Sequence, residues 1–130
     1  MTVKAREIFD HARGLYDASN CDEIQSRLLI NRAYYSAYNH VLSEVENRLF
    51  YNIDKSNPSV HQRLILLFSS INLNNPEKNK KAAQISTKLR QAKFLRSKAD
   101  YELHTSIHKN DVEHVFGLTE SIYSLVEELD

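Results

Sequence analysis

Residues that break helices or cross-link a chain are scarce in this sequence of 130 residues, which has two Gly, two Pro and one Cys. The few Gly and Pro leave few turns, and 42% apolar with 26% charged residues is typical of a globular protein built from long elements. The lone Cys21 cannot form an internal disulfide and has no second Cys with which to bind a metal, which indicates a reducing compartment. We therefore expect one all-α domain over residues 1–130.

Long apolar runs and an excess of either charge are also missing. The N-terminal residues lack the continuous apolar stretch of a signal peptide or a membrane span, which predicts a cytoplasmic protein without membrane contact. The 17 basic and 17 acidic residues cancel, so there is no overall attraction to nucleic acid. However, the range 77–98 holds eight basic residues and one acid, whereas 100–130 is strongly acidic. The basic stretch is either a solvated helix face balanced by its neighbour or a surface that faces RNA.

Apolar spacing predicts an up-and-down bundle of about five helices with a long second helix. The second helix should start after Asn20, with Glu23 completing a capping-box-like pattern. Its main apolar row consists of Ile24, Leu28, Asn31, Tyr35, Tyr38, Leu42, Val45 and Leu49. A second row consists of Ile30, Tyr34, Ala37 and Val41. Two rows indicate that this helix packs against more than one neighbour, with its tyrosines in the core or in a dimer interface.

Capping residues place the other helices. A Pro at the first helical position, preceded by a capping Asn, marks a helix start in two dipeptides, Asn57-Pro58 and Asn75-Pro76. A last helix should begin near Asn110, with Glu113 as its capping-box partner. The helices other than the second are therefore expected over residues 3–16, 58–71, 76–96 and 110–129.

Arg96 continues an apolar row of the fourth predicted helix. The preceding members of that row are Ala82, Ile85, Leu89 and Ala92. Arg96 should therefore point inward or line a cleft. One interpretation is structural: Arg96 extends from the end of the bundle or pairs with Asp100. The other is functional: a guanidinium beside Asp100, Tyr101 and His104 would form a phosphate clamp with an acid/base group. The range 97–109, which carries these residues, fits either a frayed helix or an ordered loop.

Two segments resemble the HEPN superfamily of prokaryotic helical bundles. Residues 31–40, Asn-Arg-Ala-Tyr-Tyr-Ser-Ala-Tyr-Asn-His, are similar to its Arg-x-x-Tyr-x-Ala-aromatic segment on a long second helix. Residues 95–101, Leu-Arg-Ser-Lys-Ala-Asp-Tyr, resemble the Arg-x-x-Ala-Asp-Tyr segment that opens the loop before the last helix in one large branch. The resemblance implies a metal-independent endoribonuclease of a toxin-antitoxin or defence system that acts as a homodimer, or a partner of a small nucleotidyltransferase.

The same resemblance implies that Arg96 and His104 are catalytic. The Arg would stabilise charge on the scissile phosphate, and the His would move the proton of a ribose hydroxyl. Active members have four to six residues between the Arg and the His, whereas seven lie between Arg96 and His104. Residues eight apart on a continuous helix are separated by about 12 Å, so a shared phosphate requires the chain to bend. Two alternatives are a non-catalytic protein-interaction module and a nucleotide-binding domain that holds phosphate with Arg32 and Arg96.

Further side chains around Arg96 complete the predicted RNA-binding surface. The resemblance to the Arg-x-x-Ala-Asp-Tyr branch also implies a non-catalytic arrangement, in which Asp100 orients Arg96 or Arg32 and Tyr101 packs as a structural anchor. Lysines of the basic stretch would follow the RNA backbone. The predicted binding residues are thus Arg32, Lys93, Lys98, Asp100 and Tyr101.

The remaining histidines carry weaker signals. His61 precedes an apolar run and is expected at the surface or at a helix cap. His104 and His108 have a spacing that suits two metal ligands, but it requires a helix through the undecided range, and no metal site or cofactor is predicted. The sequence has no glycine-rich phosphate loop and no nucleophile elbow.

Overall fold

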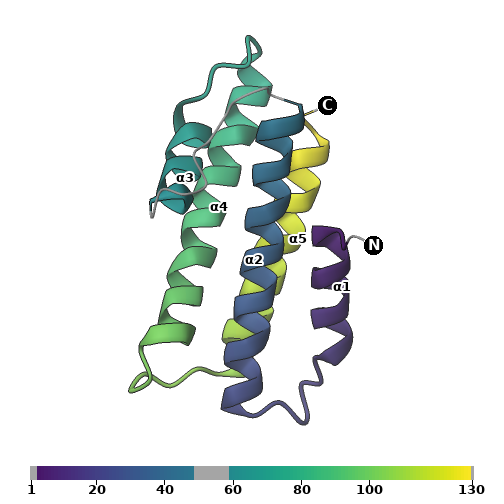
Figure 1. Ribbon diagram of the computed structural model, residues 1–130, viewed down its shortest axis with the longest axis vertical. Coiled ribbons are helices and arrows are strands. Elements are labelled where there is room, and N and C mark those ends of the chain that lie inside the picture. Colours follow the sequence, from purple (N-terminus) through teal and green to yellow (C-terminus); the bar gives the residue numbers. More distant parts are fainter. Residues whose placement is uncertain (1–2, 49–58, 130) are drawn as a thin grey trace.

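The computed structural model describes residues 3–48 and 59–129, which form helices and loops without a strand. The helices are α1 (Ala5–Leu15), α2 (Glu23–Asn47), α3 (Val60–Ser70), α4 (Pro76–Tyr101) and α5 (Lys109–Glu127). Figure 1 shows the long helices α2, α4 and α5 side by side, with α1 on one flank and α3 on the other. The prediction of an all-α bundle with a long second helix is confirmed.

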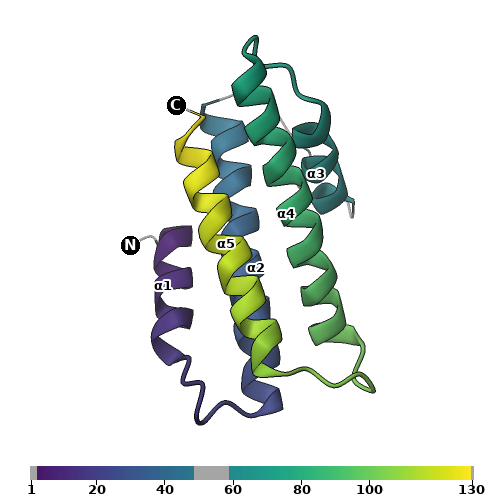
Figure 2. The ribbon, with the colours of Figure 1, turned by 180° about the vertical axis from the view of Figure 1, so that it is seen from behind.

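The short helix α3 covers only one end of the bundle. α2 packs against α1, α4 and α5, whereas α3 packs against α4. In both Figure 1 and the reverse view of Figure 2, α3 lies beside the first half of α4, at the end of the bundle where α2 finishes. The N-terminal end of α2 and the C-terminal end of α4 therefore meet at the opposite end, which α3 does not reach.

The start of α2 differs from the prediction. Asp22, and not Asn20, caps the helix, because the Asp22 carboxylate accepts the Gln25 N–H at 2.8 Å. The Asn20 N–H is held in a turn by the Asp17 carbonyl at 3.0 Å, which removes Asn20 from the capping position. The sequence-based prediction names only Asn20, and the turn moves the helix start two residues along the chain, to a second residue type that caps helices well.

The other capping predictions have mixed outcomes. The Asn75 side chain caps α4 as predicted, and Pro76 occupies its first position. For α5, the predicted start near Asn110 is confirmed to within one residue, since the helix begins at Lys109. The predicted capping-box partner, Glu113, is wrong: the Asp111 carboxylate accepts the N–H of the capping residue, His108, at 2.9 Å. The predicted cap at Asn57-Pro58 lies outside the described residues.

The burial of the two apolar rows of α2 differs from the prediction. The second row, which contains Ile30, Tyr34, Ala37 and Val41, is fully buried and forms the centre of the core. The row expected to be the main one is divided: Ile24 and Leu28 are exposed, whereas Tyr38, Leu42 and Val45 are buried. Its last member, Leu49, lies outside the described residues. His61 of α3 stacks on Tyr38, one of the buried members of this row, whereas α3 does not reach the N-terminal end of α2 (Figure 1).

Candidate functional site

Arg96 lies near the end of α4, and its side chain is 9% exposed. α4 continues to Tyr101, five residues beyond the predicted end, so Arg96 is within a helix. Its Nη1 lies 3.6 Å from Asp100 Oδ2, one turn later, and donates a hydrogen bond of 3.3 Å to the Tyr101 hydroxyl. The pairing of Arg96 with Asp100 is therefore present. The two partners of Arg96, Asp100 and Tyr101, both belong to the last turn of α4.

Three tyrosine rings surround the Arg96 guanidinium. Its Cζ lies 5.3 Å from the ring centroid of Tyr34, 5.4 Å from that of Tyr35 and 5.7 Å from that of Tyr101. Aromatic faces attract a cation at these distances. Burial acts to lower the pKa of Arg96, but the tyrosine hydroxyls, that of Tyr35 first, raise this pKa above its usual value. Arg96 therefore stays charged in an enclosed position.

Two details of this group of side chains bear on function. The Nε of Arg96 is buried and has no hydrogen-bond partner among the described residues, a state that native proteins rarely show. Tyr101, in contrast, is 73% exposed, so the expectation that it packs as a structural anchor is wrong. Its hydroxyl and ring instead contact the guanidinium from the solvent side, because Tyr101 is the last residue of α4 and lies where the bundle ends.

Asn31 links this site to α2. Its Nδ2 donates a hydrogen bond of 2.9 Å to Asp100 Oδ2, the same oxygen that faces Arg96. A polar residue within an apolar row is thereby explained, because Asn31 bonds a carboxylate that Arg96 only partly neutralises. We call Asn31, Tyr34, Tyr35, Arg96, Asp100 and Tyr101 the Arg96 cluster.

His61 joins the Arg96 cluster from α3, although the sequence suggested a surface or capping role. Its Nδ1 is hydrogen-bonded to the Tyr34 hydroxyl at 2.5 Å, and its ring stacks on Tyr38 with centroids 3.9 Å apart. Burial, and then the positive charges of Arg96 and Lys93, lower the pKa of His61 to about 4. His61 is therefore neutral at pH 7. Its contact joins residues 27 positions apart, and no local sequence pattern signals such a contact.

The other predicted site residues lie apart from Arg96. His104 is exposed in the loop 102–108, and Arg32 is exposed on α2. Among the described residues, no hydrogen bond or ion pair joins either of them to Arg96. Lys93 and Lys98 are half-buried on α4, and of the two only Lys93 acts on His61. The structure thus joins Arg96 directly to Asp100 and Tyr101 and places Lys93 where it acts on His61, whereas neither His104 nor Arg32 bonds to Arg96 among the described residues.

Arg27 holds the loop that carries His104. Its guanidinium donates to the carbonyls of Ala99 at 2.8 Å and Thr105 at 2.6 Å, with longer bonds to those of Lys98 and Glu102. Carbonyls at a helix C-terminus lack partners within the helix, and a cation bonded to them also complements the negative end of the helix dipole. We call this arrangement the Arg27 clasp. No motif pointed to it, because its acceptors are backbone atoms.

Glu23 completes the attachment of this loop. Its Oε1 accepts the Ile107 N–H at 3.0 Å and an Arg27 Nη2–H at 3.1 Å. These bonds lower the pKa of Glu23, first through the Ile107 N–H and then through Arg27. The loop 102–108 is therefore ordered by α2, which settles the choice left open for residues 97–109: helix to Tyr101, then a fixed loop.

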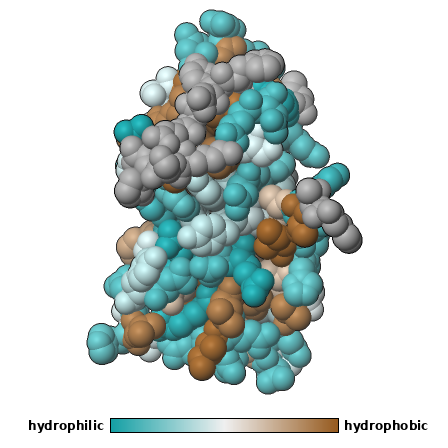
Figure 3. Space-filling view, in the orientation of Figure 1, coloured by the Kyte–Doolittle hydropathy of each residue, from teal (hydrophilic) through white to brown (hydrophobic). Residues whose placement is uncertain are grey.

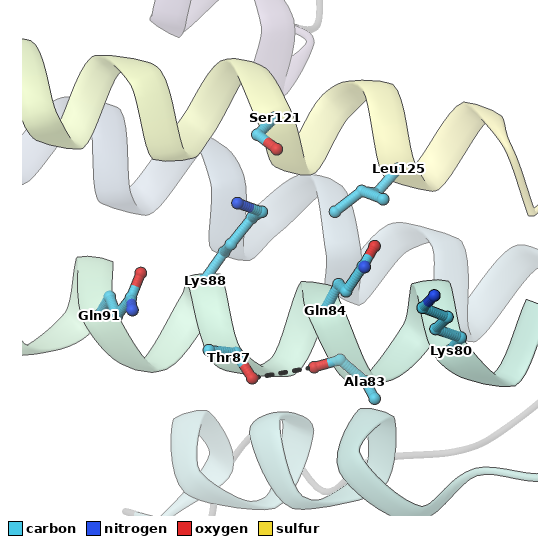
Figure 4. A pocket seen from close by; sticks show the side chains of 8 residues that line it. All are labelled: Lys80, Ala83, Gln84, Thr87, Lys88, Gln91, Ser121 and Leu125. Atoms are coloured by element: carbon cyan, nitrogen blue, oxygen red, sulfur yellow. Dashed lines mark hydrogen bonds between the residues drawn. The ribbon is translucent and has the colours of Figure 1, made fainter.

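The lysines of α4 do not form one continuous surface. Lys80 and Lys88 line an open groove of about 580 Å³ between α4 and α5, together with Gln84, Gln91 and Ser121. Figure 4 shows Lys88 directed from α4 toward Ser121 of α5. Lys81 instead pairs with Glu128 at 3.4 Å. The basic stretch is thus divided between the groove, an ion pair with the acidic C-terminal helix region, and the neighbourhood of His61.

Large apolar side chains are exposed at the end of the bundle that α3 does not cover. They are Ile24 and Leu28 on α2, Phe94 on α4 and Leu103 in the following loop, each more than half exposed. Figure 3 shows hydrophobic side chains at the surface over this end, separated by polar ones. We call these four residues the exposed apolar set. In sequence, they flank Arg27 and the end of α4 that Arg27 holds.

Comparisons with known proteins give no match. No protein-family model fits the chain, and no curated protein and no solved structure is significantly similar to it. Within the ranges 3–48 and 59–129, no helix is long and apolar enough to cross a membrane. The same ranges contain no group of three or more His, Cys, Asp or Glu side chains placed to hold a metal ion. The Arg96 cluster is therefore the feature of this chain that best indicates a function.

Proposed function

We propose that this chain is a HEPN-type, RNA-handling domain in which Arg96 binds a phosphate of the RNA backbone. The Arg96 cluster carries the proposal. Its guanidinium is held between the rings of Tyr34, Tyr35 and Tyr101 and is oriented by Asp100. A cation that is already fixed loses little side-chain freedom on binding, and the planar fork of Arg matches phosphate oxygens.

Nearby basic side chains support the same ligand. Lys93 and Lys98 are half-buried on the same helix as Arg96, and Arg32 is exposed on the neighbouring helix. Each adds positive potential, which attracts a polyanion at long range even without direct contact. The cytoplasmic toxin-antitoxin or defence setting is part of the proposal on the strength of the two sequence motifs alone.

Cleavage without a metal would need an imidazole beside the bound phosphate. The base removes the proton of the ribose 2′-hydroxyl, the 2′-oxygen attacks phosphorus, and the 5′-oxygen leaves with a proton from an acid. The products are a 2′,3′-cyclic phosphate and a 5′-hydroxyl. His104, the sequence-based choice, would serve only if the loop 102–108 brought it to Arg96, and the Arg27 clasp opposes that movement.

A homodimer is the second element of the proposal. The exposed apolar set lies at one end of the bundle, and a second copy of the chain that covered these four side chains would remove their apolar surface from water. A dimer formed there would place two copies of the Arg96 cluster near one interface. The same surface also supports the alternative function, a non-catalytic module that binds a nucleotidyltransferase or another protein.

The test is cleavage and binding of total RNA and purified tRNA in excess chelator, comparing wild type with Arg96→Met and with Arg90→Met. Arg90 is exposed on the same helix, so its change removes an equal charge outside the cluster. Loss of RNA binding or cleavage in Arg96→Met alone supports the proposal. Equal effects in both variants would reduce the role of Arg96 to bulk charge, and no RNA interaction in wild type would leave the protein-interaction function.

A further inference from the structure

Three basic side chains from two helices converge beside Tyr34. His61 bonds the Tyr34 hydroxyl, Arg96 lies over the Tyr34 ring, and Lys93 lies one turn before Arg96 and acts on His61. We propose that His61, Lys93 and Arg96 form a binding site for the phosphate group of a nucleotide, with Tyr34 positioning the imidazole. The identification of RNA as the source of that phosphate rests on the proposed function, whereas the phosphate site itself does not.

The position of His61 on α3 favours an anion. His61 is the second residue of a helix of 11 residues, and the first turn of that helix contains no acidic residue. The N-terminus of a helix carries partial positive charge and N–H groups that point outward. The independent observation is Arg96, whose side chain is more than nine-tenths buried and whose Nε has no partner among the described residues. Two positive features from different helices thus face the same place.

Among the described residues, the two charged groups that act on the His61 imidazole are both positive. They are Arg96 and Lys93, and the rings of Tyr34, Tyr35 and Tyr38 also contact this imidazole. The acid of the cluster, Asp100, is shared between Arg96 and Asn31. A bound phosphate would add a negative charge beside these two cations and would favour the protonated imidazole.

The hydrogen bond to Tyr34 sets which imidazole nitrogen meets the ligand. Burial raises the pKa of Tyr34 well above its usual range, so the phenol keeps its proton. A Tyr34 hydroxyl that donates to Nδ1 leaves the proton of neutral His61 on Nε2, where it donates to a phosphate oxygen. Stacking on Tyr38 fixes the plane of the ring. Tyr34 and Tyr38 are therefore positioning residues, and His61 is the group that contacts phosphate.

The test is a titration of the imidazole groups by ¹H–¹⁵N NMR, with and without inorganic phosphate. We expect phosphate to shift the His61 signals and to raise the His61 pKa from about 4, while exposed His104 does not change. Lys93→Gln should weaken phosphate binding by about tenfold, as for loss of one charge-assisted hydrogen bond. Lys88→Gln is the matched control, because Lys88 is also half-buried on α4 but lines the groove toward α5.

The outcomes separate this inference from the proposed function. No response of His61 to phosphate, or an equal response of His104, would overturn the phosphate site even if the protein cleaves RNA. A response of His61 with no binding of an RNA oligonucleotide, but with binding of a nucleoside monophosphate, would support the site and contradict the RNA proposal. Tighter binding of the oligonucleotide than of the monophosphate would support both. If Lys93→Gln fails to fold, the wild-type titration still decides.

Discussion

One apolar row of α2 has opposite environments in the two halves of the helix. In the C-terminal half, Tyr38, Leu42 and Val45 are buried, and His61 of α3 stacks on the first of them. In the N-terminal half, Ile24 and Leu28 belong to the same row but are exposed. The difference shows that periodicity identifies a helix face that can be covered, and that another element decides whether it is covered. The uncovered part of the row belongs to the surface at which we propose a dimer interface.

The largest expected effect comes from two matched substitutions in this row, which test whether its two halves differ in burial. Leu42→Ala should lower the free energy of unfolding by about 2–5 kcal/mol, because the side chain is buried and its removal leaves a cavity. Leu28→Ala should change it by less than about 0.5 kcal/mol, because this side chain is 55% exposed. Urea unfolding measures both values. Similar losses would mean that the N-terminal half of the row is covered in solution.

The Arg27 clasp stabilises the fold at the N-terminal end of α2 through hydrogen bonds to the end of α4 and the following loop. Arg27→Met should cost about 2 kcal/mol, because carbonyls at the end of α4 lose charge-assisted hydrogen bonds. Arg32→Met on the same helix is the control and should have almost no effect, because Arg32 is exposed. The comparison by urea unfolding would fail if both variants lost equal stability.

Acid should lower the free energy of unfolding, because His61, which packs against the buried part of this row, must take up a proton. Its pKa is lowered from 6.5 to about 4 in the folded protein, so the unfolded chain binds a proton at a higher pH than the folded chain does. Stability linked to His61 is therefore complete above pH 6.5 and is lost as the pH falls toward 4. Thermal unfolding against pH should show this slope in wild type and a smaller slope in His61→Gln. An unchanged slope in the variant would show that other groups are responsible.

The smallest expected effect concerns the boundary between the two halves. Asn31→Ala should cost about 1 kcal/mol, because the partly exposed Asp100 carboxylate loses a hydrogen bond of 2.9 Å from the Asn31 amide. The ion pair of Asp100 with Arg96 remains in this variant. Chemical denaturation measures the loss, and the same variant should leave the size-exclusion profile unchanged, since Asn31 is outside the exposed apolar set. A change in oligomeric state would instead place Asn31 in the interface.

Local patterns predicted the helices better than the site. The spacing of apolar residues, a capping Asn and Pro76 are enough to locate the start of α4. The apolar row that ends at Arg96 predicts an inward guanidinium, and pairing with Asp100, one of the two interpretations, is present. The end of α4 was set too early, because its last turn is stabilised by Arg27 from another helix. Such a contact between distant residues leaves no periodic signal.

The choice of histidine shows the same limit. His104 was selected because it follows Arg96 in sequence, whereas the imidazole found next to the Arg96 cluster comes from α3. The residues next to Tyr34 and His61 in the sequence form no motif that would pair the two side chains. They meet because the start of α3 lies beside α2 in the folded protein. The HEPN resemblance, the dimer and the RNA ligand stay predictions.

The Arg27 clasp couples local opening of the loop 102–108 to fraying of the end of α4. The Ile107 N–H belongs to a surface loop, yet it is bonded to Glu23, and Glu23 is bonded to the guanidinium that holds the end of α4. Solvent can exchange this amide hydrogen only when the bond to Glu23 opens. Exchange at Ile107 and fraying of the last turn of α4 should therefore be correlated events, although the two belong to different segments of the chain. A molecule that captured Arg27 would release both at once.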